Sequence, residues 1–137
     1  MINKELLEEH SYNGEGFKPL VVYKTWRVAF LNYINELESE NISRVERHPE
    51  TDEVFVLMRG GGVLFIGEGE PEVKRLFPQI MEQGVIYNVK PLTWHTIVLT
   101  RDATVLIVEN SDTSEKNSQY SDLSTELKEF IQNNGLT

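Results

Sequence analysis

The residues best suited to chemistry in this sequence are two histidines and two glutamates, Glu46, His48, Glu53 and His95. Glu46 and His48 are two residues apart, so in a strand both side chains project from the same face. His95 shares a face with Ile97 and Leu99, which places it on an apolar, inward-facing wall. Two imidazoles and a carboxylate form the ligand set of non-haem iron(II) centres, and a fourth oxygen ligand also suits manganese or zinc. An ion with an open coordination position would polarise a substrate carbonyl or lower the pKa of bound water.

Each of these residues also has an alternative that needs no metal. Glu46 has arginines nearby and could be a solvent-exposed charge. His48 lies in a turn-like run and could be a surface or hydrogen-bonded histidine. The glutamate that opens the next strand could pair with Arg47 or Lys90, and His95 could be a neutral core histidine satisfied by hydrogen bonds. The sequence leaves these alternatives open.

Short strands are the elements that must position these side chains. Runs rich in β-branched and aromatic residues recur at regular intervals and are separated by glycine, proline and charged turns. We expect strands at 53–58, 63–66, 84–89, 94–99 and 104–108, a further strand at 73–81 broken near Pro78, and one long or two short strands between 19 and 33, interrupted at Lys24 and Thr25. Residues 35–43 are expected to form a loop or a short helix. Short strands at regular spacing are typical of a sandwich or a barrel.

The two ends of the chain differ from this pattern. Leu123, Leu127, Phe130 and Ile131 fall on one face of a helix that Gly135 would end. That helix is expected to cover the barrel wall or a partner subunit. The predicted organisation is an N-terminal arm at 1–18, a β-barrel domain at 19–110, and a polar link with the C-terminal helix at 111–137.

Composition restricts the partners. The 137 residues include no cysteine, so a metal must be bound by His, Asp or Glu. The net charge of −9 is spread along the chain and argues against nucleic acid, which binds clustered Lys and Arg. No apolar run approaches the roughly 20 residues of a membrane span, and the N-terminus lacks the pattern of a secretory signal. We therefore expect a cytoplasmic protein that binds neither nucleic acid nor membrane.

Two segments resemble the motifs of the cupin superfamily. The first cupin motif reads His-x-His, three or four residues, Glu, six residues, Gly, and here His48 is followed by four residues, Glu53, six residues and Gly60. Gly84 opens the second motif, and His95 is similar to its metal-binding histidine. The resemblance covers about half the chain.

Three positions depart from the family pattern. Glu46 stands where the first motif has its first histidine, Leu92 where the second motif has a turn glycine, and Leu99 where that motif ends in asparagine. The resemblance implies a double-stranded β-helix, the jelly-roll barrel of cupins, that is commonly a dimer. It also implies a divalent ion such as Mn, Fe, Zn or Ni near the barrel mouth, so we expect a homodimer with such a cofactor.

The sequence supports a ranked set of functions and leaves open whether the protein is an enzyme. The first is a metal-dependent isomerase, lyase or oxygenase acting on a small polar metabolite, with Glu46, His48, Glu53 and His95 on the ion and with Arg47, Tyr87, Lys90 and Trp94 binding the substrate. The second is a non-catalytic module that binds a small, sugar-like molecule without metal. The third is an interaction protein that works through its dimer surface and C-terminal helix. No catalytic residue is assigned.

Overall fold

The computed structural model describes residues 1–136 and consists mainly of strands. The strands are β1 Gly16–Tyr23, β2 Trp26–Asn32, β3 Arg44–Arg47, β4 Glu53–Arg59, β5 Gly62–Glu68, β6 Arg75–Ile80, β7 Ile86–Val89, β8 Trp94–Leu99, β9 Thr104–Asn110 and β10 Gln119–Asp122. Short 3-10 turns occur at η1 Asn35–Leu37, η2 Ser39–Asn41 and η3 Glu115–Asn117, and the α-helix α1 spans Thr125–Asn134.

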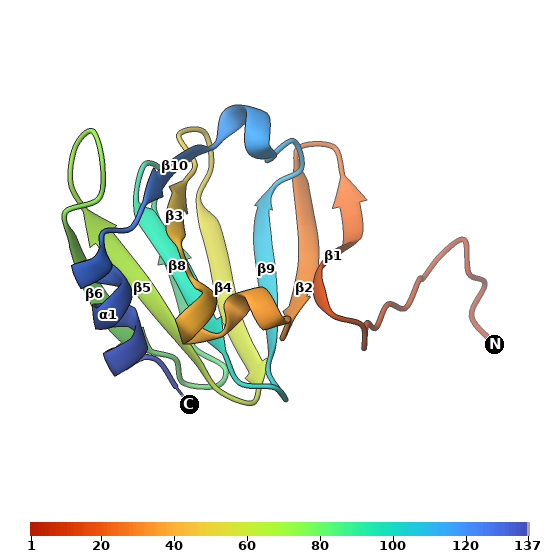
Figure 1. Cartoon of the computed structure of the whole chain (residues 1–137). Helices are drawn as coiled ribbons and strands as arrows, with labels where there is room; N and C mark the ends of the chain where they lie inside the picture. The colour runs from red at the N-terminus through yellow and green to blue at the C-terminus, as the bar shows by residue number, and fades with distance from the viewer. Residues whose placement is uncertain (137) are drawn as a thin grey trace.

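The strands form two antiparallel sheets of five strands each (Figure 1). Their orders are β1-β2-β9-β4-β7 and β10-β3-β8-β5-β6, here called sheet A and sheet B. Most connections after β2 cross from one sheet to the other, so the strands wind in pairs around a common interior. This arrangement confirms the predicted all-β double-stranded β-helix with a C-terminal helix.

Two hydrophobic cores result from the alternation of side chains along the strands. The core between the sheets is built from both of them and includes Phe55, Leu57, Leu64, Ile97, Val105 and Ile107. The second core lies on the outer face of sheet B, where Val45, Phe65 and Val98 pack with Ile131 of α1. The helix therefore covers sheet B from outside (Figure 1).

The ends of α1 follow from its sequence. The Ser124 hydroxyl accepts a hydrogen bond from the Leu127 backbone N–H at 3.2 Å and caps the start of the helix. Gly135 ends it, with its N–H donated to the Ile131 carbonyl at 2.7 Å. All four residues of the predicted apolar stripe pack in the outer core. Within residues 1–136, no helix has the length and apolar character that crossing a membrane requires.

Three strand predictions need correction. The predicted break near Pro78 is wrong, because β6 runs through this residue, which pairs with Phe65. Since β6 is an edge strand, the missing proline N–H costs no ladder bond. The strand β10 was not predicted, and it lies in the segment expected to be a polar link. The strand β1 begins at Gly16, inside the segment expected to be an arm.

Two of the turns between strands contain a residue with a left-handed backbone, Gly60 between β4 and β5 and Leu92 between β7 and β8. Gly60 has φ 73°, and a Cβ there would lie 2.6 Å from the Ala103 Cα, so the turn requires glycine. Leu92 has φ 64° at the position where cupins carry a glycine. The turn of the second motif is therefore kept, but with a strained leucine. The Leu92 N–H donates to the His48 carbonyl at 3.0 Å, which ties this turn to the end of β3.

Candidate functional site

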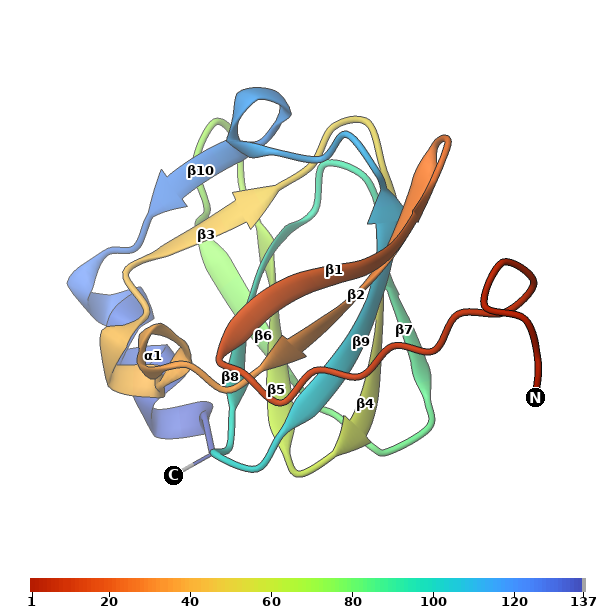
Figure 2. The ribbon, with the colours of Figure 1, turned by 90° about the vertical axis from the view of Figure 1, so that its right-hand side faces the viewer.

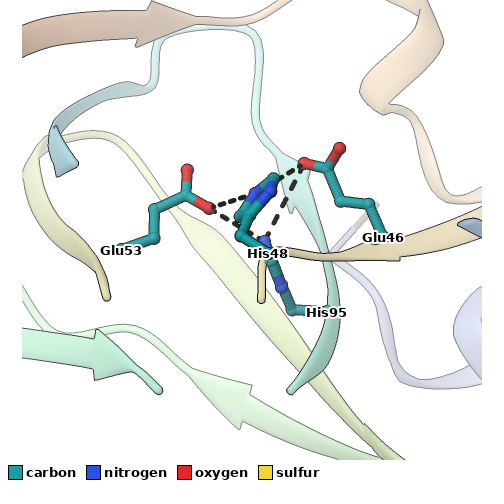
Figure 3. Close-up of side chains that lie close together, drawn as sticks. All are labelled: Glu46, His48, Glu53 and His95. Carbon is teal, nitrogen blue, oxygen red and sulfur yellow. Dashed lines mark hydrogen bonds and ion pairs between the residues drawn. The ribbon is translucent and has the colours of Figure 1, made fainter. Parts of the chain in front are cut away.

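The two histidines and two glutamates predicted as metal ligands meet inside the barrel near one end. Glu46 on β3 is paired in register with His95 on β8, so both project from the inner face of sheet B. His48 follows β3 directly, and Glu53 reaches them from β4 of sheet A. Figure 3 shows the two imidazoles between the two carboxylates. We call these four residues the His/Glu cluster.

The distances in the cluster suit the binding of one ion. Glu53 Oε1 lies 3.1 Å from His48 Nε2 and 2.9 Å from His95 Nε2. Glu46 Oε1 lies 3.7 Å and 3.8 Å from the same two nitrogens. One ligand atom from each residue falls within 4.8 Å of all the others. Contraction toward a common centre would bring these atoms to ordinary metal–ligand distances of about 2.0–2.2 Å.

Hydrogen bonds fix the orientation of both imidazoles. His95 Nδ1 lies 2.9 Å from the Thr93 carbonyl, which can only accept, so this nitrogen carries a hydrogen. His48 Nδ1 lies 2.8 Å from the Ser118 hydroxyl. That hydroxyl donates its own hydrogen to the Ser114 carbonyl at 2.6 Å, so His48 Nδ1 is the donor to Ser118. Metal-binding histidines are held in this way, with the second ring nitrogen anchored and Nε2 turned to the ion.

The protonation of the cluster follows from these bonds. Since both Nδ1 atoms are donors, each Nε2 can bond to the Glu53 carboxylate only if it also carries a hydrogen. Both imidazoles are then positively charged around one carboxylate. A divalent ion would carry the same charge as the two Nε2 protons and could take their place. The donor set and its geometry therefore fit a divalent metal.

Burial and charge shift the pKa values in the cluster. Burial raises the pKa of Glu53, but hydrogen bonds from His48 and His95 outweigh it and lower the pKa to about 2. Burial lowers the pKa of each histidine, whereas the hydrogen bond to Glu53 and its charge raise it, and the net pKa of both is raised. The cluster is therefore an ionised carboxylate with two imidazoles that hold their protons.

A cavity of about 600 Å³ extends from the cluster. Residues of β1 and β2 and residues of β3 and β10 line it. Figure 2 shows these two pairs of strands at the same side of the barrel. Polar residues on its wall include Glu109, Arg27, Ser118 and Tyr120. All four members of the cluster also line it, including Glu46, whose carboxylate faces the two imidazoles while its side chain remains 42% exposed. The cluster is thus open to a small molecule.

Glu109 is a titratable residue of the cavity that sequence reasoning missed. It is 6% exposed on β9, and its Oε2 accepts hydrogen bonds from Arg27 at 2.7 Å and 3.2 Å. Burial and the charge of Glu53 raise its pKa to about 7, against the lowering effect of Arg27. Its place one residue beyond the Val108↔Val54 pair sets it opposite Glu53. The only signal in the sequence is an acidic residue that ends an apolar strand.

The four residues predicted to bind substrate lie away from the cavity wall. They are Arg47, Tyr87, Lys90 and Trp94. Arg47 and Trp94 are sequence neighbours of cluster residues, and neighbours in a strand point to opposite faces. They stack on each other outside sheet B, with the guanidinium carbon 4.0 Å from the indole ring centroid. The Lys90 ammonium pairs with Asp52 at 3.2 Å, and the Tyr87 hydroxyl accepts a bond from the Glu82 N–H at 2.9 Å.

The two sheets, their strand order and the internal cluster define a cupin-type barrel. No protein-family model matches the sequence, and no curated protein matches it. The similarity to known proteins is therefore one of structure.

Several solved cupin-type barrels superpose on the chain. Pac13 from Streptomyces, as a tyrosine-to-phenylalanine variant with uridine, has a TM-score of 0.54 at 11% identity and covers 88% of this chain and 97% of its own. QdtA 3,4-ketoisomerase from Thermoanaerobacterium thermosaccharolyticum, a double mutant in complex with TDP, has a TM-score of 0.51 at 18% identity, covering 68% of this chain and 64% of its own. CapF from Staphylococcus aureus has a TM-score of 0.56 at 14% identity, covering 82% of this chain and 34% of its own. At these identities the similarity concerns the fold, and it confirms the cupin resemblance at that level.

Proposed function

We propose that the protein is a metal-dependent enzyme that acts on a small metabolite bound in the cavity, by isomerisation, lysis or oxygen insertion. Glu46, His48, Glu53 and His95 would hold one divalent ion. The observation that supports this most directly is the convergence of four ligand atoms within 4.8 Å. The anchoring of both Nδ1 atoms, which turns both Nε2 atoms toward the same point, supports it further.

The ion and Glu109 would have different roles in the reaction. The ion would supply Lewis acidity to a substrate oxygen. Glu109 lies on the same cavity wall, with Oε2 held by Arg27 and with no hydrogen bond to Oε1 among residues 1–136. Among the described residues, every fully buried side-chain oxygen has a hydrogen-bond partner. Since Glu109 Oε1 has none, it is not fully buried, and the residue lines the cavity. We assign to Glu109 the transfer of a proton to or from the substrate.

Two similar folds carry reactions of the proposed classes. Pac13 is described as a nucleoside dehydratase, which is a lyase reaction, and QdtA as a ketoisomerase. A metal or proton-transfer site inside a barrel of this type is compatible with either.

Metal binding is tested on untagged protein. Elemental analysis and calorimetric titration with Mn²⁺, Fe²⁺, Ni²⁺ and Zn²⁺ are expected to show one ion per chain. His95→Gln should abolish uptake. His10→Ala is the matched control, because His10 lies in the N-terminal arm and pairs only with Glu8 at 3.3 Å within the described chain. Absence of uptake by the parent protein, or equal uptake by His95→Gln, would reject the metal centre.

A second candidate is a binding module without metal. It is favoured by the hydrogen bonds of Glu53 to both imidazoles, which satisfy the buried groups of the cluster without an ion. In that case the ligand would bind to the carboxylate oxygens of Glu46 and Glu53 that the imidazoles leave free, because every imidazole N–H already has an acceptor. Ligand binding that is unchanged by a chelator, together with the absence of metal uptake, would favour this candidate.

We also propose a homodimer formed through the outer face of sheet A. This face presents half-buried apolar residues, among them Val28, Phe30, Val56 and Leu106, and Ile86 is 71% exposed beside them. Cross-strand pairs place Phe30, Leu106, Val56 and Ile86 in one row. Light scattering should give a mass of twice the 15.8 kDa of one chain. The Val56→Lys variant should have the mass of a single chain, because the charge disrupts the apolar row. A parent protein of one chain mass would reject the dimer.

A further inference from the structure

The cavity wall changes from polar to apolar over a single step along each strand. On β4, β8 and β9, the polar residue that faces the cavity is followed on the same face by an apolar one, in the pairs Glu53 and Phe55, His95 and Ile97, and Glu109 and Ile107. Residues two apart on a strand are separated by about 7 Å. On these three strands, therefore, one polar side chain is adjoined on the same face by an apolar one, whereas other walls of the cavity also carry polar residues such as Glu36, Asn41 and Arg44.

Residues outside these three strands extend the apolar layer. Leu31 of β2, Leu37 of η1 and Ile42 line the same cavity. Leu31 and Leu37 also pack against the internal core, so this part of the wall is held in place. A ligand that is anchored at the His/Glu cluster and extends toward these residues would place the rest of its body against apolar side chains.

We propose that the ligand of this site is amphiphilic, with an oxygen-bearing head group at the His/Glu cluster and an uncharged hydrocarbon or aromatic body against the apolar part of the wall, chiefly the partly buried Leu31 and Leu37 beside Ile97. This inference rests on the proposed function, since it takes the cluster as the point where the ligand is anchored. A carboxylate or an enolisable carbonyl would supply the head group. Each methylene buried in such a layer raises affinity about fourfold. The hydroxyls of a polyhydroxylated body would lose their hydrogen bonds to water against the same layer.

Octanoate and gluconate are the probes for this proposal. They carry the same head group and the same charge, but one has a hydrocarbon body and the other a polyhydroxylated one. Calorimetry with each probe, on protein with and without Zn²⁺, is expected to give an affinity for octanoate more than about tenfold above that for gluconate. Equal or tighter binding of gluconate would overturn the proposal.

A pair of neighbouring residues on β2 supplies the variants. Leu31 lines the cavity, whereas Phe30 belongs to the outer face of sheet A. Leu31→Gln should reduce octanoate affinity about tenfold and leave gluconate affinity unchanged, and Phe30→Gln should leave both unchanged. An equal loss in Phe30→Gln would locate octanoate outside the barrel and overturn the proposal.

These outcomes are distinguishable from failure of the metal centre. Preference for octanoate without any metal uptake would reject the ion and support the amphiphilic ligand. Metal uptake with preference for gluconate would support the ion and overturn the amphiphilic ligand.

Discussion

Binding of a divalent ion below the pKa of both cluster histidines should release about two protons. Both Nδ1 atoms are held as donors, to the Thr93 carbonyl at 2.9 Å and to the Ser118 hydroxyl at 2.8 Å. Only the Nε2 protons can therefore leave when the ion binds. Glu53 raises the pKa of His48 and of His95, so at pH 6 both imidazoles start out charged.

The magnitude follows from this count. Each proton that must leave weakens apparent metal affinity about tenfold per unit of pH below the histidine pKa, or about 1.4 kcal/mol. Two protons give about a hundredfold loss of affinity for each unit of acidification. Calorimetric titration in buffers with different ionisation enthalpies measures the number of protons released, and the same data give the affinity.

Variants separate the sources of the protons. His48→Gln should release about one proton, whereas Glu46→Gln should still release about two and bind more weakly, because Glu46 contributes an oxygen and no proton. Glu109, whose pKa is about 7, is a further proton source, and Glu109→Gln removes it. Affinity that does not depend on pH between roughly 5 and 6.5, or release of no proton, would refute the description of the cluster as two charged imidazoles around one carboxylate.

Three further predictions concern groups around the cluster. The pKa of Glu109 is raised from 4.5 to about 7, so this group favours the folded state below pH 4.5 and that contribution is lost as pH rises through 7. The metal-free parent protein should therefore lose up to about 3 kcal/mol of unfolding free energy between roughly pH 5 and 8 in urea titrations, and Glu109→Gln should lose less. Equal pH dependence of the two would contradict this. Ser118→Ala removes the acceptor of His48 Nδ1 and should weaken metal affinity about 10-fold or more, and unchanged affinity would show that this hydroxyl does not orient the ring. Leu92→Gly removes the steric strain of a leucine at φ 64° and should raise the free energy of unfolding by about 1 kcal/mol in denaturant titrations. A less stable variant would contradict the claim that Leu92 is strained.

The cluster could be predicted because its signals are local. The two-residue spacing of Glu46 and His48 fixes their common face, and the apolar residues that follow His95 fix its direction inward. The resemblance to the cupin motifs then predicts that the three residues and Glu53 converge, as they do within 4.8 Å. The assignment of these residues to a metal stays a prediction until uptake is measured.

The residues that line the rest of the cavity could not be predicted in the same way. Arg47 and Trp94 have side chains suited to binding a substrate, but strand alternation turns each away from the face of its cluster neighbour. Glu109 and Arg27 meet through the pairing of β2 with β9, which joins residues distant in sequence. The strand β10 consists of Gln119–Asp122, which has no apolar alternation, and forms because it pairs with β3. These features depend on which strands pair and in which register, and the residue pattern within each strand does not determine that.

The cluster draws its members from both halves of the fold, with Glu53 from sheet A and Glu46 and His95 from sheet B. An ion held there would cross-link the two sheets, since the sheets could not separate without releasing it. Because such an ion binds only the closed form, it would slow the opening of the barrel. Amide hydrogens of β4 and β8 would then exchange with deuterated solvent more slowly after loading, whereas those of the distant edge strand β6 would change least.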